Sequence, residues 1–176
     1  MKLVDGRVNL DGCALPEPGF FEKRRLLKGV RLLEQAAVVE PPYGAASLFA
    51  AKVYERLGRN KESLRWMRKA QSVAPDNMIV ALELGGVLSK LGLHTEAVAV
   101  LTEAAKQNPH DPRVHSNLGV SLLLSGDAKA SVAAFSTLVA LEPNQQTNIR
   151  LLNLAVAVHE GRESQPMSEA QIIRSL

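Results

Sequence analysis

Residues 78–109 read MIVALELGGVLSKLGLHTEAVAVLTEAAKQNP, and the same pattern occurs once before and once after this stretch. Each copy closes with a proline, and successive closing prolines are 34 residues apart: Pro75, Pro109 and Pro143. A glycine lies seventeen residues before each of them: Gly58, Gly92 and Gly126. A fixed period of this length is the signature of stacked structural repeats.

Within each copy, the apolar residues predict two helices separated by the glycine. Leu84 and Leu88 are four residues apart and lie on one face of a helix, as do Ala50 and Tyr54, and Leu118 and Leu122. The glycine should end the first helix because it adopts the left-handed conformation freely. The proline should end the second because it cannot continue the hydrogen-bond ladder. One hairpin of this kind cannot bury its own apolar face, so we expect the copies to stack.

The repeat resembles the tetratricopeptide repeat (TPR), whose small and bulky positions recur in the same order. In the second copy these positions are Leu84, Gly85, Leu88, Ala97, Leu101, Ala104 and Pro109. In the first they are Ala50, Ala51, Tyr54, Ser63, Met67, Ala70 and Pro75, and in the third Leu118, Gly119, Leu122, Ser131, Phe135, Leu138 and Pro143. The resemblance implies an all-α fold, a right-handed superhelical solenoid of antiparallel helix pairs with a concave peptide-binding face. The small residues Ala51, Gly85 and Gly119 should let the helices of a pair approach closely.

The period also divides the rest of the chain. We expect an N-terminal arm over residues 1–17 and a helical domain over 18–176. The domain should contain a capping helix (18–41), three full repeats (44–77, 78–111 and 112–145), and a partial repeat with a C-terminal cap (146–176). Pro41 lies 34 residues before Pro75, so the capping helix, from Pro18 to Val39, corresponds to the second helix of a degenerate repeat. Ser168 should be the N-cap of a short last helix, a degenerate second helix with Ile172, Ile173 and Leu176 facing inward.

The N-terminal arm has two interpretations. Asp5-Gly6 between Leu3-Val4 and Arg7-Val8 is typical of a two-residue hairpin turn, although such a small hairpin is marginal by itself. The arm is either a mobile tail, or a segment whose apolar residues lie in the groove of this molecule or of a neighbour. Those residues are Leu3, Val4, Val8 and Leu10.

The composition is that of a folded protein of one domain, with 176 residues, 46% hydrophobic and 22% charged. Cys13 is the only cysteine, so no intrachain disulfide is possible. We find neither a signal-peptide core nor an apolar run of bilayer length, and we expect a cytoplasmic protein.

Charge is uneven along the chain. Residues 1–77 carry 14 Lys and Arg against 9 Asp and Glu, whereas residues 78–176 carry 7 against 9. A basic cluster lies at Lys23, Arg24, Arg25, Lys28 and Arg31. This half could attract an acidic protein or a nucleic acid, or it could simply form solvated helix faces. The scarcity of aromatic residues for base stacking disfavours nucleic acid. Self-assembly through Trp66 and the arm is a third hypothesis.

The resemblance also implies the site, because the first helix of each TPR lines the concave face. The corresponding residues here are Leu48, Phe49, Lys52, Arg56, Ile79, Leu82, Glu83, Lys90, Arg113, Ser116, Asn117, Val120 and Leu124, and in the partial repeat Arg150, Leu151, Leu154 and Val158. They make an apolar floor with scattered charges, which suits an amphipathic helix or an extended apolar segment. Some of the leucines would instead be inter-repeat core. We therefore expect a non-catalytic protein–protein interaction scaffold.

Particular chemistries find little support in the sequence. The TPR positions that clamp chaperone carboxylates are occupied by Leu48, Lys52, Glu83, Arg113 and Asn117, and a glutamate there would repel a carboxylate. The four histidines are scattered without a metal-ligand spacing, and His115 should be a packing or capping residue. There is no phosphate-binding glycine loop, and Cys13 has no neighbouring base. We expect no enzyme activity, no cofactor and no metal.

Overall fold

A computed structural model describes residues 3–4, 7–8, 17–39 and 44–176 of the chain. Its strands are β1 (Leu3–Val4) and β2 (Arg7–Val8). Its helices are α1 (Phe20–Val39), α2 (Ala45–Arg56), α3 (Asn60–Val73), α4 (Met78–Lys90), α5 (His94–Gln107), α6 (Pro112–Ser125), α7 (Ala128–Leu141), α8 (Gln146–His159) and α9 (Glu169–Ser175). Apart from the two-residue strands, the described chain is helical, as predicted.

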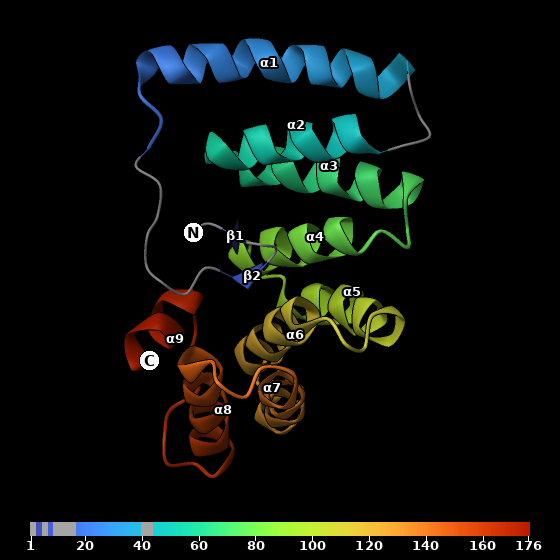
Figure 1. Ribbon diagram of the computed structural model, residues 1–176. Coiled ribbons are helices and arrows are strands. Elements are labelled where there is room, and N and C mark those ends of the chain that lie inside the picture. Colours follow the sequence, from blue (N-terminus) through green and yellow to red (C-terminus); the bar gives the residue numbers. More distant parts are fainter. Residues whose placement is uncertain (1–2, 5–6, 9–16, 40–43) are drawn as a thin grey trace.

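The helices form a solenoid in which each hairpin packs on the next. Within the repeats, α2 packs on α3, α4 on α5 and α6 on α7, and contacts between α3 and α4 and between α5 and α6 join successive repeats. The layers follow one another from α1 to α8 in chain order (Figure 1). The predicted TPR-like solenoid is confirmed. In the described residues, no helix is both long and apolar enough to cross a bilayer.

The turn within each hairpin depends on its glycine. Gly58, Gly92 and Gly126 have φ angles of 72°, 74° and 93°, a left-handed conformation that other residues rarely adopt. The second helices end at Val73, Gln107 and Leu141, each two residues before its closing proline. The observed helix ends therefore coincide with these glycines and prolines.

Two helical glycines set the distance between the helices of a pair. A Cβ added at Gly119 would lie 2.5 Å from the ring of Phe135, and one added at Gly85 would lie 2.9 Å from the Leu101 side chain. Phe135 and Leu101 are both fully buried, so neither can move aside easily. The small residue on the first helix thus makes room for the bulky residue on the second.

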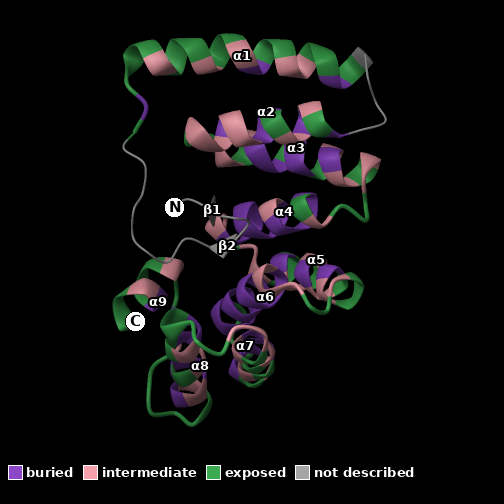
Figure 2. Ribbon diagram, viewed as in Figure 1, coloured by how far each residue is buried: buried purple, intermediate pink, exposed green. Residues whose placement is uncertain are grey.

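The N-terminal helix α1 begins at Phe20, two residues later than predicted. It packs on α2, with Val30 and Ala37 buried. Its outer face carries large exposed residues, and Figure 2 shows most of this helix as exposed. They include Phe20 and Phe21, which are 75% and 78% exposed. In the repeat pattern, α1 corresponds to the second helix of a repeat whose first helix is missing. The face of α1 that would pack on that first helix is therefore exposed.

The C-terminal helix α9 lies elsewhere than predicted. Ser168 accepts a hydrogen bond from the Gln171 N–H, which confirms it as the N-cap. Ile172 is fully buried in one cluster with Val120 and Leu124 of α6 and Leu154 of α8, all at concave positions of first helices. The helix therefore caps the array from its concave side, not as the second helix of the partial repeat. At the position where Gly85 and Gly119 allow close approach, α8 has the larger residue Asn153, which is exposed, so no second helix packs closely there.

The described residues of the arm form the predicted hairpin. β1 and β2 pair antiparallel, with Leu3 opposite Val8 and Val4 opposite Arg7. β2 contacts α6, so this part of the arm lies against the array of its own molecule (Figure 1). The turn at Asp5-Gly6, together with Leu10 and Cys13, lies outside the described residues.

We predict that Gly119→Ala lowers the free energy of unfolding by about 1–3 kcal/mol, because the new methyl group would overlap the buried Phe135 ring. Chemical denaturation of the variant and the wild type measures this difference.

The matched control is Gly29→Ala in α1, where an added Cβ meets nothing within 4 Å. That change should raise the stability by about 0.5–1 kcal/mol, since alanine favours a helix over glycine. Equal effects of the two substitutions would show that close approach of α6 and α7 does not depend on Gly119.

Candidate functional site

The candidate site is the concave floor, which we define as the inward-facing side chains of the first helices α2, α4, α6 and α8. Its exposure changes along the array. Phe49 of α2 and Ile79 of α4 are 58% and 51% exposed, and Leu48 is half-buried. Towards the C-terminus, the floor residues Ser116, Val120 and Leu124 of α6 are buried. The floor thus has an open N-terminal half and a covered C-terminal half.

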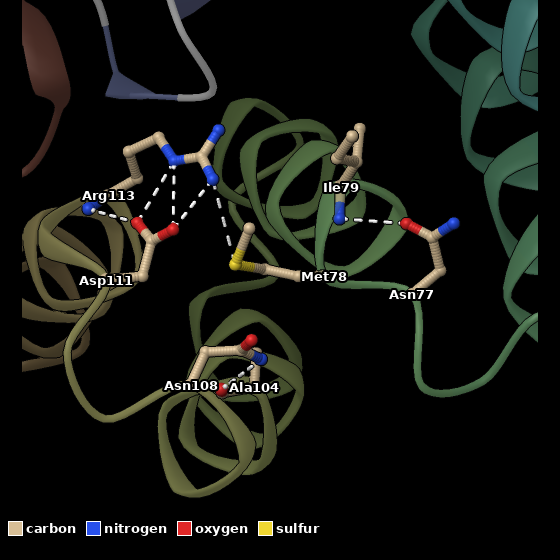
Figure 3. Close-up of polar contacts among 7 residues, drawn as sticks. All are labelled: Asn77, Met78, Ile79, Ala104, Asn108, Asp111 and Arg113. Atoms are coloured by element: carbon tan, nitrogen blue, oxygen red, sulfur yellow. Dashed lines mark hydrogen bonds and ion pairs between the residues drawn. The ribbon is translucent and has the colours of Figure 1, made fainter.

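Phe49 and Ile79 make the open half apolar. Ile79 lies in the first turn of α4, where the Asn77 side chain accepts a hydrogen bond from the Ile79 N–H (Figure 3). It also accepts one from the Val80 N–H. This cap fixes the start of the helix and the position of Ile79. Most large apolar residues of the first helices, such as Leu82, are buried in the core, so the exposure of Phe49 and Ile79 at floor positions indicates a contact surface.

A network of ion pairs crosses from α2 to α4 on the floor. The Lys52 ammonium lies 2.6 Å from a Glu83 carboxylate oxygen and 3.3 Å from Glu55, and Lys90 pairs with Glu55. Burial opposes the ionised forms, but the charges of Lys90 and Lys52 lower the pKa of Glu55. In the same way, Glu55 and Glu83 raise the pKa of Lys52 against its burial. Burial raises the pKa of Glu83, although Lys52 opposes this shift. These charges are already paired, so the floor here is polar without being an open anion site.

The start of α6 holds a further predicted cation of the floor, Arg113. Pro112 occupies the first turn, and Asp111 caps the helix by accepting a hydrogen bond from the Arg113 N–H. The Arg113 guanidinium turns back to the same carboxylate at 2.7 Å, and its Nη2 lies 3.9 Å from the Met78 sulfur (Figure 3). Arg113 therefore links the starts of α6 and α4.

The covered half of the floor lies beneath the chain itself. Asn117 is buried, and Ser121 and Ser89 are buried with their hydroxyls 3.2 Å apart. Ile172 of α9 shares a hydrophobic cluster with Val120, Leu124, Leu151 and Leu154, and β2 contacts α6. The Arg150 guanidinium donates a hydrogen bond to the Leu176 carbonyl at 2.8 Å. Part of the predicted site is therefore covered by its own C-terminal helix.

Glu169 is the unusual charge of this region. It lies at the first turn of α9, and its Oε1 is buried without a hydrogen-bond partner in the described part of the chain. Burial raises the pKa of Glu169 to about 7, while the charge of Lys90 partly opposes this shift and Glu55 adds to it. The carboxyl is therefore held between its two protonation states near neutral pH.

Sequence reasoning missed three members of this region: Glu55, Glu169 and Ile172. Glu55 occupies a concave position of its repeat, so the TPR pattern could have found it. Glu169 and Ile172 reach the floor only because α9 folds back, for which the local sequence has no signal. Of the other predicted residues, Arg56 at the α2 end pairs with Glu22 of α1 at 2.9 Å, and Arg150 is exposed on α8.

His115 and Trp66, two further candidates from the sequence, are both buried in the structure. The His115 ring is buried, and its Nε2 lies 2.8 Å from the Pro109 carbonyl oxygen, as expected for a capping residue. Within the described ranges, no group of three or more His, Cys, Asp or Glu residues is arranged to hold a metal ion. Trp66 is only 8% exposed and the Lys69 ammonium lies over its ring, so it offers no open surface for self-assembly.

Comparison with known proteins agrees with this architecture. Two sequence models described as tetratricopeptide repeat match residues 46–77 and 88–155, together more than half of the chain. The chain is 32% identical over 114 residues to Protein CTR9 homolog of Arabidopsis thaliana, an alignment that covers 64% of this chain but 10% of that protein. The chain thus spans about a tenth of the length of this relative.

Solved structures show the same fold. YrrB, described as "a TPR protein with an unusual peptide-binding site", superposes with a TM-score of 0.69 at 20% identity, over 86% of this chain and 76% of that one. MamA from Desulfovibrio magneticus RS-1 superposes with a TM-score of 0.68 at 18% identity, over 87% and 86%.

We predict that α9 is held more firmly at pH 5.5 than at pH 8. Its docked form has the raised Glu169 pKa and so binds the proton more tightly than the released form, whose pKa is near 4.5. The free energy that protonation of Glu169 contributes to docking is fully present below pH 4.5. It is lost as the pH rises through about 7. Amide hydrogen exchange, corrected for intrinsic rates, should show protection of residues 169–175 that falls at least roughly tenfold between pH 5.5 and 8. In Glu169→Gln this difference should vanish; a pH dependence that persists would assign it to another group.

Proposed function

Since this chain belongs to the tetratricopeptide repeat family, we propose that it is a non-catalytic protein–protein interaction scaffold that binds a partner peptide or helix in its concave groove. The observation that carries the proposal is α9 itself. Ile172 of α9 is fully buried in a hydrophobic cluster that includes Val120, Leu124 and Leu154, three residues at predicted concave positions. A surface that receives this helix has the chemistry to receive another. The peptide-binding site named for YrrB, which has the same fold, supports the same role.

The open half of the floor is the place where a partner would first make contact. Phe49 and Ile79 expose apolar surface there, and the paired charges of Lys52, Glu83 and Glu55 lie on the same helices. Exposed apolar residues beside a polar rim are the usual composition of a protein interface. The partner should therefore bring apolar side chains flanked by polar ones.

Site-specific cross-linking tests the proposal. With a photo-reactive residue at position 49 or 79, we expect partner proteins from native extract to be captured, and the same proteins at both positions. The matched controls are positions 99 and 136, which are exposed on the second helices α5 and α7. Capture that is equal at the control positions, or lost at 49 and 79, would contradict binding in the groove.

Groove variants extend this test. Phe49→Ser and Ile79→Ser should weaken partner capture at least roughly tenfold, because each removes exposed apolar surface from the floor. Both residues are more than half exposed, so the melting temperature should stay within a few degrees of the wild type. Met167→Ser, at a 77% exposed residue outside the floor, should leave capture unchanged.

A second candidate function is binding of an acidic partner by α1. Lys23, Arg24, Arg25, Lys28 and Arg31 are all exposed on this helix, whereas Glu22 and Glu34 are half-buried and bonded to Arg56 and Tyr54. Phe20 and Phe21 are exposed at its start, with ring centroids 5.5 Å apart. Exposed aromatics beside a basic cluster are more favourable for such binding than the sequence alone suggested.

For this second candidate, we predict that a polyglutamate peptide or a single-stranded RNA binds with an affinity that falls steeply as salt increases. Charge reversal in Arg25→Glu with Lys28→Glu should weaken binding at least roughly tenfold at low salt. Fluorescence anisotropy measures both effects. Binding that is independent of salt, or unchanged in the double variant, would rule out α1 as the acidic-partner site.

A further inference from the structure

We propose that α9 is an internal ligand of the concave groove, and that the external partner is an amphipathic helix with the same pattern as α9. That pattern is an acidic residue followed three and seven residues later by bulky aliphatic residues, as in Glu169, Ile172 and Leu176. A partner of this kind competes with α9 for the covered half of the floor. This inference rests on the proposed function, since it names the partner and the regulation of the same groove.

The apolar anchor of α9 is a single side chain. Ile172 is the one residue of this helix that is fully buried, and its cluster includes Val120, Leu124, Leu151 and Leu154 at concave positions of α6 and α8. Leu176 packs against the same cluster and Ile173 is half-buried. Two aliphatic residues four positions apart on one helical face are the usual anchors of a helix in a groove.

The polar contacts fix the direction of the helix on the floor. Glu169, at the N-terminal end of α9, lies within the electrostatic reach of Lys90 and Glu55, at the junction of α4 and α2. At the other end, the Arg150 guanidinium of α8 donates a hydrogen bond to the Leu176 carbonyl at 2.8 Å. The helix therefore runs from the α2–α4 side of the floor towards α8.

Several features make α9 releasable. It has seven residues, which is too few for a stable isolated helix, and Arg162, Glu163 and Ser164 of the preceding connection are exposed. Its docking leaves the Glu169 Oε1 buried without a hydrogen-bond partner in the described part of the chain. An unpaired buried carboxyl opposes docking. Elements with few buried contacts are the first to open in native proteins, so α9 can leave while the array remains folded.

Competition follows from these contacts. Val120 and Leu124 are buried in the cluster that also holds Ile172, so a partner helix that binds at these residues must displace α9. Because α9 is tethered, its effective concentration at the floor is high, on the order of millimolar for a short flexible linker. A partner helix must therefore bind more tightly than α9 alone, and its additional contacts in the open half would supply this affinity.

The test uses the full chain and a fluorescein-labelled synthetic peptide with the sequence of residues 166–176. In Ile172→Gln, the internal helix loses its buried anchor, and we expect the peptide to bind at least roughly tenfold more tightly than to the wild type. The control Arg174→Gln, at an exposed residue of the same helix, should bind like the wild type. A peptide carrying glutamine in place of Ile172 should not bind either protein.

The outcomes separate the two proposals. Equal affinity of the wild type and Ile172→Gln for the peptide would show that α9 does not compete, and absence of binding to both would show that the groove does not take this pattern. Either result overturns the inference. Neither changes the cross-linking result at positions 49 and 79, which reports on groove binding by itself.

A second variant covers the case in which Ile172→Gln fails to fold. Glu169→Gln keeps the shape of the side chain and removes the buried negative charge, so α9 should dock more firmly at pH 8. We then expect the peptide to bind the variant at least roughly threefold more weakly than the wild type at that pH. Equal or tighter binding would contradict the role of α9 as a competitor.

Discussion

The structure depends on one constraint: a single helical hairpin cannot cover its own apolar face. Each repeat solves this by packing on the next, and the close approach of its two helices relies on a small residue opposite a bulky one, such as Gly119 opposite Phe135. This stacking buries the apolar side chains of the second helices between repeats. It leaves the inward-facing side chains of the first helices on one shared surface, the concave floor. The binding surface is therefore a consequence of how the core is built.

The same constraint operates at the two ends of the array, where no further repeat follows in the described chain. At the N-terminal end, α1 covers α2 and leaves its own outer face bare, with Phe20 and Phe21 exposed. At the C-terminal end, α9 turns back and covers part of the concave floor with Ile172. The N-terminal helix α1 thus presents an apolar and basic surface. The C-terminal helix α9 instead lies on part of the concave face, which is the face that a TPR array normally offers to its partners.

Much of this could be predicted from the sequence, because the information lies in a short period. The glycines and prolines fixed the helix boundaries, and the alignment of positions such as Leu84 and Gly85 indicated which residues form the core. The position of α9 could not be predicted, because Ile172, Ile173 and Leu176 form an apolar face that fits either side of α8. Glu169 and Lys90 are far apart in the sequence and meet only through this fold-back. Long-range contacts of this kind leave no periodic signal.

The central claim is that α9 lies on the concave floor of the folded array. Methyl nuclear Overhauser effects in the full chain test it most directly, with isoleucine, leucine and valine methyl groups labelled. If α9 lies on the floor, we expect cross-peaks from Ile172 to methyl groups of Val120, Leu124, Leu151 or Leu154. Cross-peaks from Ile172 to Val156 instead, or random-coil shifts throughout residues 169–175, would contradict it.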